Sequence, residues 1–252
     1  MSGGFTRAEV CVVALAECFR GDGEIVANPI GTIPMIAGRL ARATFEPDLM
    51  ATDGEAALIA NDEAFAWPGG RVVEYYNPYR SMFDVVWSGR RHVVMGATQI
   101  DPYGNLNTTV IGPWESPTVR LPGSGGGADV ASFAWRTIIV MAQDRRKFTP
   151  RLDFMTSPGY LTGPGAREAH GLPAGTGPYR VVTQLGVYGF DPGTLRMELL
   201  SAFEGVRVPE DIQAASGFEI PISRQFRREG DPTAEELAAM HALDPAGVVL
   251  GG

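Results

Sequence analysis

Two acidic residues follow a short apolar segment in the sequence Thr52-Asp53-Gly54-Glu55. A carboxylate in such a position can act as a nucleophile in covalent catalysis or as a general base. The same residue types also build ordinary polar turns, because Asp and Gly favour turn conformations. We therefore treat Thr52, Asp53 and Glu55 as candidate catalytic residues, whose role depends on the site around them.

Two glycine-containing segments could bind a ligand through their backbone. The first segment is residues 28–32, where a predicted strand passes into a predicted helix. The first N–H groups of a helix can bind a carboxylate, a thioester oxygen or a phosphate. The second has four glycines among residues 123–127, so a ligand could lie directly against it. A tight turn and a flexible loop would explain the same segments without a ligand. The predicted contacts are Asn28, Gly31, Thr32, Gly125, Gly126 and Gly127.

A third polar segment, TQIDPYGNLNTT at residues 98–109, is rich in turn-forming residues. Asp101 and the asparagines can bind local backbone, and Gly104 can supply a positive φ. The segment follows a predicted buried strand, and α/β proteins bind ligands beyond the carboxyl ends of their parallel strands. Gln99 and Asn105 are therefore predicted to contact substrate, although a purely structural turn is equally consistent with the pattern.

Other kinds of site find little support. The three histidines have no metal-ligand spacing to cysteine or carboxylate, so we expect no metal site. No Gly-x-Ser-x-Gly, Walker A or dinucleotide-binding motif is present. Arg90 and Arg91 could bind the phosphates of a ligand, but arginines before a buried strand usually form a solvated edge. Cys11 and Cys18 lie seven residues apart on a predicted helix, roughly 10 Å, which is too far for a disulfide.

The composition is typical of one globular domain. The chain has 252 residues, of which 44% are hydrophobic and 20% charged, which suffices for one large core. A net charge of −8 without a basic block disfavours nucleic-acid binding. No apolar run reaches the roughly 18 residues of a membrane span, and the N-terminus lacks a secretory signal. We expect a cytoplasmic protein without membrane association.

The order of apolar segments predicts an α/β fold. Strands alternate with helices in the first half, which favours a parallel sheet, and hairpin-like turns follow in the second half. The terminal helix should be capped at Asp231, with Pro232 at its first position. We therefore predict a single domain over residues 1–252, with an open, mostly parallel sheet flanked by helices and an antiparallel extension. The expected strands are 24–29, 48–52, 91–101, 108–112, 136–143, 152–159, 179–191 and 196–203, and the expected helices are 8–19, 33–43, 128–135 and 233–243.

Taken together, these segments resemble the beta subunit of class I coenzyme A transferases, of the glutaconate CoA-transferase type. The similarity covers roughly residues 8–220 and implies an open NagB-like α/β fold. It also implies an alpha subunit of related fold in an α2β2 heterotetramer, and an active site between the two chains. The implied substrate is an acyl-CoA, so coenzyme A enters as substrate and no cofactor is bound permanently. The matching segments are ANPIGTIPMIAGRLA, GATQIDPYGNLNTT, GSGGGADVA and DFMTSPGYLTGPGAREAHGLPAGTGPYRVVT.

In such transferases a glutamate of the beta subunit attacks the thioester, giving an acyl–glutamyl anhydride and then a glutamyl–CoA thioester. Backbone N–H groups stabilise the tetrahedral oxygen, and the resemblance implies this role for Gly31 and residues 125–127. The glutamate belongs at the end of the second strand, where this chain has Thr52. Threonine cannot form the anhydride. Asp53 should face the other way, and Glu55 lies beyond the turn.

The segment TDGEA also resembles the beta subunit of a CoA-transferase-like hydrolase that opens a ring of a steroid-derived acyl-CoA. In that branch the transferase glutamate is absent, water cleaves a carbon–carbon bond, and the base is implied to come from the alpha subunit. Three functions stay open. The first is CoA transfer between carboxylic acids, with Glu55 or Asp53 as nucleophile. The alternatives are hydrolysis of a cyclic or β-keto acyl-CoA, and a non-catalytic subunit that binds CoA.

Overall fold

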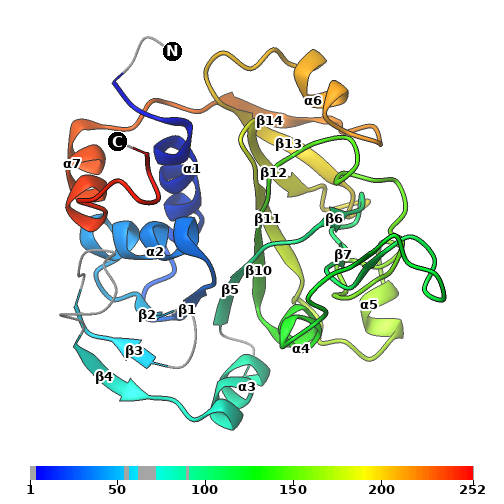
Figure 1. Cartoon of the computed structure of the whole chain (residues 1–252), viewed down its shortest axis with the longest axis horizontal. Coiled ribbons are helices and arrows are strands. Elements are labelled where there is room, and N and C mark those ends of the chain that lie inside the picture. The colour runs from blue at the N-terminus through cyan, green and yellow to red at the C-terminus, as the bar shows by residue number, and fades with distance from the viewer. Residues whose placement is uncertain (1–3, 54–56, 62–71, 89–90, 252) are drawn as a thin grey trace.

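Five neighbouring parallel strands form the centre of the main sheet. The computed structural model describes residues 4–53, 57–61, 72–88 and 91–251. Within these residues the central strands run side by side through the middle of the molecule (Figure 1). In the order of the sheet they are β2 (Met50–Thr52), β1 (Val26–Pro29), β5 (Arg91–Met95), β10 (Arg136–Val140) and β11 (Pro178–Val182).

Antiparallel strands extend this sheet at both ends. The full order is β14-β13-β12-β11-β10-β5-β1-β2-β3-β4, in which β14 is again parallel to β13. These strands are β3 (Ala57–Ile59), β4 (Val73–Tyr76), β12 (Gly186–Phe190), β13 (Met197–Ala202) and β14 (Ile222–Arg228). The predicted fold class, an open and mostly parallel sheet with an antiparallel extension, is therefore confirmed.

Helices cover both faces of the sheet. Figure 1 shows α1 (Arg7–Ala16), α2 (Thr32–Thr44) and α7 (Ala234–Leu243) packed together, and their apolar residues share the main core with Val94. The helices α3 (Tyr79–Trp87) and α4 (Gly127–Phe133) share a smaller core with Val93. The two cores lie on opposite faces because successive residues of a strand point in opposite directions.

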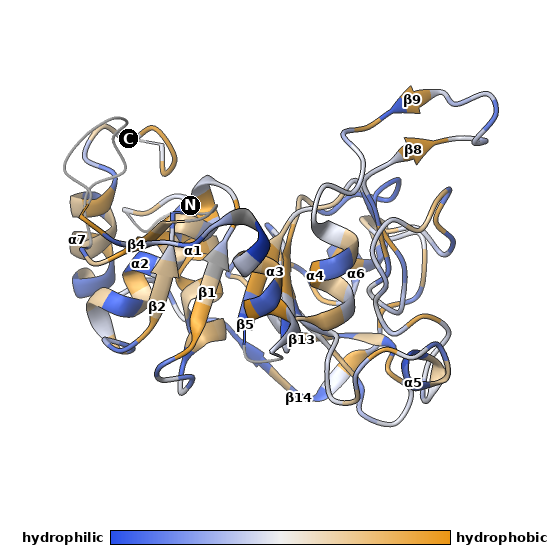
Figure 2. Ribbon diagram, turned by 90° about the horizontal axis from the view of Figure 1, so that it is seen from below, coloured by the Kyte–Doolittle hydropathy of each residue, from blue (hydrophilic) through white to orange (hydrophobic). Residues whose placement is uncertain are grey.

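The remaining elements are short. They are η1 (Glu17–Phe19), α5 (Ala166–Ala169), α6 (Glu210–Ala214), the pair β6 (Gln99–Ile100) with β7 (Leu106–Asn107), and the pair β8 (Val110–Ile111) with β9 (Val119–Arg120). The hairpin of β8 and β9 projects from the body of the molecule (Figure 2). No helix in the described parts of the chain has the length and apolar character that a membrane crossing requires.

Several details differ from the sequence-based expectation. The segment 179–191, expected as one strand, contains the antiparallel strands β11 and β12. The strand expected over 91–101 stops at Met95, and residues 99–100 pair instead with 106–107. The segment 152–159 is not a strand; it consists of bends and one isolated bridge, from Ser157 to Leu106. The N-cap of α7 is Thr233 rather than Asp231. Thr233 has Glu236 three residues later, which completes a capping box, whereas the residue at the same distance from Asp231 is an alanine.

Both cysteines are free, buried thiols, as the sequence predicts. Burial raises the pKa of Cys11 to about 11 and that of Cys18 to about 12. Because the thiolate is the reactive form, we expect neither thiol to react with iodoacetamide at pH 8 in the folded protein. Both should react in guanidinium, and mass spectrometry of the alkylated chain measures the difference. Rapid labelling of the folded protein would contradict the expectation.

Candidate functional site

A cavity of about 770 Å³ lies between α3, α4 and the central sheet. The chain leaves β1 for α2 and reaches the neighbouring strand β5 from α3, so the topology reverses between these two strands. Ligands of open α/β sheets bind at such switch points. Arg91, Val93 and Met95 alternate along β5 and line the cavity, and Gly96 follows them at the end of the strand.

The glycine loop at residues 123–127 forms one wall of this cavity. Gly123 and Gly125 have positive φ angles of 94° and 50°, which residues with a Cβ rarely adopt. A Cβ on Gly126 would lie 3.1 Å from the ring of Phe83. A Cβ on Gly127 would lie 3.2 Å from the terminal methyl group of Met95. The backbone at Gly126 and Gly127 thus packs closely against side chains that line the cavity.

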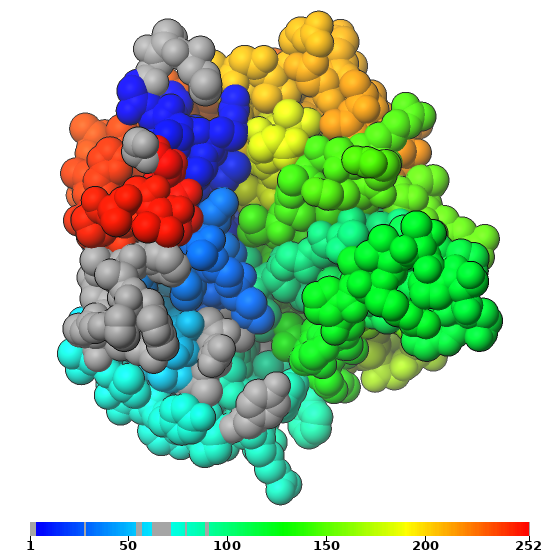
Figure 3. Space-filling view, in the orientation of Figure 1, coloured from blue at the N-terminus to red at the C-terminus, as the bar shows by residue number. Residues whose placement is uncertain are grey.

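The N-terminal end of α2 lies at the same strand ends. Its N-cap is Gly31, with a φ of 111° and no side chain to cap the first turn. Thr32 is exposed, and Ile30 lines the cavity. An uncapped first turn offers N–H groups and a positive helix end to an anion. Figure 3 shows blue, cyan and green segments of the chain together on one face of the molecule.

The strand β2 places Thr52 on the same side of the sheet as the cavity. Ala51 pairs with Ala27, and Asn28 pairs with Val93, so Thr52 continues the row that runs through Asn28 to Val93. Residues of one row in a parallel sheet share a face, and two interstrand spacings separate Thr52 from Val93 by roughly 10 Å. The Thr52 side chain is buried, with 6% of its surface exposed.

Asp53 and Glu55 are the two candidate carboxylates, and only Asp53 is among the described residues. Asp53 begins a turn, in which its Oδ1 accepts a hydrogen bond from the Ala57 N–H at 3.1 Å and its own N–H donates to the Ala57 carbonyl at 2.9 Å. It follows Thr52 and therefore leaves the strand toward the opposite face. Glu55 lies outside the described residues, so its role as nucleophile stays a prediction.

Gln99 and Asn105 use their side chains within the protein. Gln99 Nε2 donates to Asp153 Oδ2 at 3.0 Å, and its Oε1 accepts from Asn107 Nδ2 at 2.7 Å. Asn105 is fully buried; its Nδ2 donates to Asp101 and to the Leu161 carbonyl, and its Oδ1 accepts from two backbone N–H groups. These bonds hold loops together inside the protein, and contact of either side chain with substrate stays a prediction.

The same contacts explain why the sequence combines QIDPYGN with TSPG. Gly159 donates its N–H to Asn105 Oδ1 at 2.7 Å. A Cβ on Gly159 would lie 2.5 Å from the backbone nitrogen of Asn105 and closer still to the carbonyl carbon of Gly104. The hydroxyl of Ser157, two residues earlier, lies 3.3 Å from the position of a Cβ on Gly127. The two motifs therefore pack as one unit behind the glycine loop.

The sequence analysis missed the inner part of the cavity. Arg91, expected at a solvated edge, has only 1% of its surface exposed. It is the first residue of a strand buried at every position, and its alternation with Val93 and Met95 was the available signal. Phe83 of α3 also lines the cavity, but its segment gave no strand or helix signal of its own. Arg90 lies outside the described residues.

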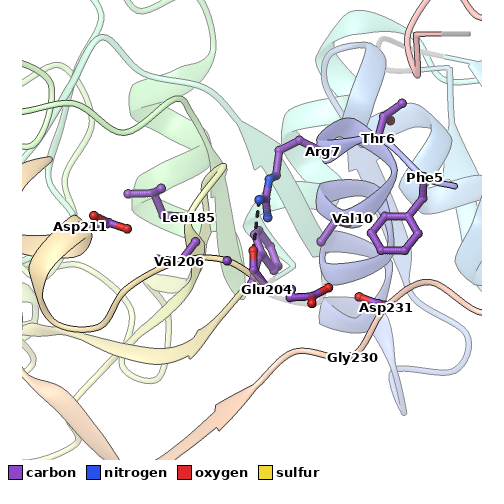
Figure 4. A pocket seen from close by; sticks show the side chains of 12 residues that line it. Phe5, Thr6, Arg7, Val10, Leu185, Glu204, Val206, Asp211, Gly230 and Asp231 are labelled. Carbon is purple, nitrogen blue, oxygen red and sulfur yellow. Dashed lines mark hydrogen bonds between the residues drawn. The ribbon is translucent and has the colours of Figure 1, made fainter. Parts of the chain in front are cut away.

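A second cavity of about 350 Å³ lies at the N-terminal end of α1. Figure 4 shows Arg7 and Val10 of α1 facing Glu204 and Val206, with a hydrogen bond from Arg7 Nη2 to the Glu204 carbonyl at 3.3 Å. None of the described residues that the sequence selected lines this cavity, so we place the candidate site in the larger one. Within the described residues, no group of His, Cys, Asp and Glu side chains could hold a metal ion.

Fold and cavity together define an α/β protein of the class whose ligands bind beyond the carboxyl ends of parallel strands. Within that class, the Coenzyme A transferase family matches residues 80–213. Relatives that align over nearly the whole chain support the match. The chain belongs to the Coenzyme A transferase family, as its motifs predict.

Two curated relatives represent different reactions. The cholesterol ring-cleaving hydrolase IpdB subunit of Rhodococcus jostii (strain RHA1) is 38% identical over 95% of this chain and 93% of its own length. A subunit of the glutaconate CoA-transferase of Acidaminococcus fermentans is 33% identical over 96% of this chain and 93% of its own length.

Solved structures of the same two enzymes are also similar to this chain. Rhodococcus jostii RHA1 IpdAB superposes with a TM-score of 0.87 at 35% identity, over 98% of this chain and 97% of the matched one. Glutaconate coenzyme A-transferase from Acidaminococcus fermentans superposes with a TM-score of 0.89 at 28% identity, over 98% of each chain. The decarboxylase AibA/AibB, at 24% identity and a TM-score of 0.80 over 98% of this chain and 100% of its own, shares the fold.

Proposed function

We propose that this chain is the beta subunit of a two-subunit enzyme that cleaves a carbon–carbon bond in a cyclic or β-keto acyl-CoA by hydrolysis. The observation that carries the proposal is Thr52. It occupies the strand end where the transferase resemblance requires a glutamate, and it lies in the row that leads to the cavity. A hydroxyl cannot form the acyl anhydride through which CoA is transferred, so the reaction needs another nucleophile, which we take to be water.

The relatives support this reading without deciding it. The relative named as a hydrolase is 38% identical to this chain, and the one named as a transferase is 33% identical. Both are named as subunits, and the name IpdAB denotes two kinds of chain in that solved structure. We accordingly propose an alpha subunit as partner, in an α2β2 assembly located in the cytoplasm, with the active site between the chains.

In this proposal the chain binds and polarises the thioester. The carbonyl oxygen lies against the N–H groups of the glycine loop and of the first turn of α2, around Gly31, Thr32 and residues 125–127. A base of the alpha subunit removes a proton from water, and the hydroxide adds to the keto carbon. The bond from that carbon to the α-carbon breaks, its electron pair becomes the thioester enolate that the N–H groups stabilise, and the α-carbon then takes a proton. One water is consumed, and a carboxylate and an acyl-CoA result.

CoA transfer stays the second candidate, because Glu55 follows the turn that Asp53 begins and because a named glutaconate CoA-transferase subunit is 33% identical over most of the chain. In that case Glu55 would swing back toward the cavity and take the thioester acyl group. A non-catalytic subunit is the third candidate. It requires that joint replacement of Thr52, Asp53 and Glu55 leave turnover unchanged.

A trapping experiment separates these candidates. We expect no covalent adduct on Thr52, Asp53 or Glu55 when the two-subunit enzyme is mixed with acyl-CoA and then treated with borohydride, as measured by peptide mass spectrometry. Product formed in ¹⁸O-water should carry the label in its new carboxylate. The variant Thr52→Glu is the matched control, because it restores a carboxylate on the cavity side and should become labelled. A modified Glu55 in the unaltered chain would establish transfer instead.

A further inference from the structure

Among the described residues that line the large cavity, Arg91 is the one with a charged side chain. Arg91 is the first residue of β5 and shares a face of the strand with Val93 and Met95, which also line the cavity. Its Nη1 donates to the carbonyl oxygen of Met82 in α3 at 3.0 Å. The side chain therefore extends from the start of β5 toward the middle of α3, alongside the cavity.

This guanidinium has no carboxylate partner among the described residues. In the part of the chain that the structure describes, its Nε has no hydrogen-bond acceptor, and its Nη2 contacts the sulfur of Met82 alone, at 4.0 Å. The neighbouring cavity walls are apolar, including Phe83, Val86 and Val130. Burial lowers the pKa of Arg91 to about 10, so the group is still cationic at neutral pH. A buried charge without a partner is unfavourable unless an anion arrives to pair with it.

Arg167 shows how this chain uses a buried arginine for structure alone. Its exposed fraction is 3%. Its two Nη atoms donate to backbone carbonyls of two separate segments and to the hydroxyl of Thr176. Arg167 does not line the large cavity, whereas Arg91 does and makes one such bond. Among the described residues the Nε of each arginine lacks an acceptor, so the two differ in their Nη bonds and in their position beside the cavity. This difference leaves Nη2 of Arg91 for a ligand.

We infer that Arg91 binds a carboxylate carried by the acyl part of the acyl-CoA substrate, at the inner end of the cavity. Nε and Nη2 form one edge of a guanidinium, and two parallel N–H donors match the two oxygens of a carboxylate. Gly96 follows Arg91 by five residues, roughly 16 Å along the strand, and the arginine side chain covers part of that distance. An acyl chain of a few carbons reaches from the glycine loop to the guanidinium. The inference rests on the proposed action on acyl-CoA and adds that the substrate has a second, free carboxylate.

The test compares two thioesters that differ only in that group, glutaryl-CoA and its terminal monoamide. The dissociation constant of each for the two-subunit enzyme is measured by calorimetry. We expect glutaryl-CoA to bind about 10- to 100-fold more tightly than the monoamide, the range of a charge-assisted hydrogen bond. In Arg91→Gln this preference should disappear while the affinity for the monoamide is retained, and Arg91→Lys should keep part of it. Arg227→Gln, which changes an exposed arginine in β14, should leave the preference intact.

The possible outcomes test separately the role of Arg91 and the proposed action on acyl-CoA. Equal affinity of the unaltered enzyme for the two thioesters would overturn the role of Arg91 and leave the proposed action on acyl-CoA standing, and this comparison does not depend on any variant folding. A carboxylate preference that survives in a folded Arg91→Gln enzyme would also overturn it. Failure of both thioesters and of CoA to bind would overturn the proposed function, and the role of Arg91 with it.

Discussion

Gly159→Ala is expected to destabilise the protein by about 3 kcal/mol, the upper part of the range for overpacking a close-packed site. The added Cβ would meet the backbone of Gly104 and Asn105, at 2.5 Å from the Asn105 nitrogen. Backbone atoms cannot move aside by changing a rotamer, so the two motifs would have to separate. Their separation would strain the hydrogen bond from Gly159 to Asn105 and the turn that Asp101 supports.

Urea unfolding of the two-subunit enzyme, followed by tryptophan fluorescence, measures this loss. Gly230→Ala is the matched control, because a Cβ at Gly230 would meet nothing within 4 Å and the residue has no positive φ. It should change the free energy of unfolding by less than about 0.5 kcal/mol. Equal stability of the two variants would show that the QIDPYGN and TSPG motifs do not pack as the structure describes.

Gly126→Leu is expected to weaken acyl-CoA binding by about 10- to 100-fold, since added bulk in a close-packed site costs roughly 1–3 kcal/mol. Gly126 has a φ of −86°, so the substitution adds bulk without forcing an unfavourable backbone conformation. Its Cβ would lie 3.1 Å from Phe83, and the rest of the side chain would enter the cavity. The space for the acyl group should therefore shrink.

The dissociation constants for glutaryl-CoA and its monoamide measure this effect as well. A steric obstruction should weaken both thioesters equally, whereas a change at Arg91 should weaken only the carboxylate. Gly230→Leu, at a residue outside the large cavity, should alter neither. Unchanged affinity in a folded Gly126→Leu enzyme would place the acyl group outside this cavity.

Local patterns predicted much of the fold, because they depend on residues close together in the chain. Thr6 and Glu9 form the expected capping box of α1. The apolar runs of β5 and β10 are buried as expected of strands covered on both faces. The strands β4 and β14 were not predicted, because β4 is exposed at every position and β14 at all but two. Strands at the ends of a sheet bury too little surface to leave a hydrophobic pattern.

The candidate site, like the fold, was predictable from sequence only where local residue patterns determine it. The glycines at 31 and 123–127 could be selected from sequence because glycine tolerates positive φ angles and close packing of the backbone. The structure places Gly31 between β1 and α2, and it places the glycine loop before α4 in the wall of the large cavity. Gln99 and Asn105 were selected for their types, but their partners Asp153 and Gly159 are each 54 residues away. No local pattern could show that these amides are already bonded within the protein.

The sequence by itself determined the family, the succession of the central strands along the chain, and the presence of threonine instead of glutamate at position 52. These are properties of residue identity and short spacing. Only the tertiary structure decided what lies beside what: that Thr52 shares a face with the cavity, and that Arg91 is buried there with a single backbone partner. The reason is physical. Burial and pairing depend on contacts between α3, α4 and β5, and those contacts exist only once the sheet has brought the segments together.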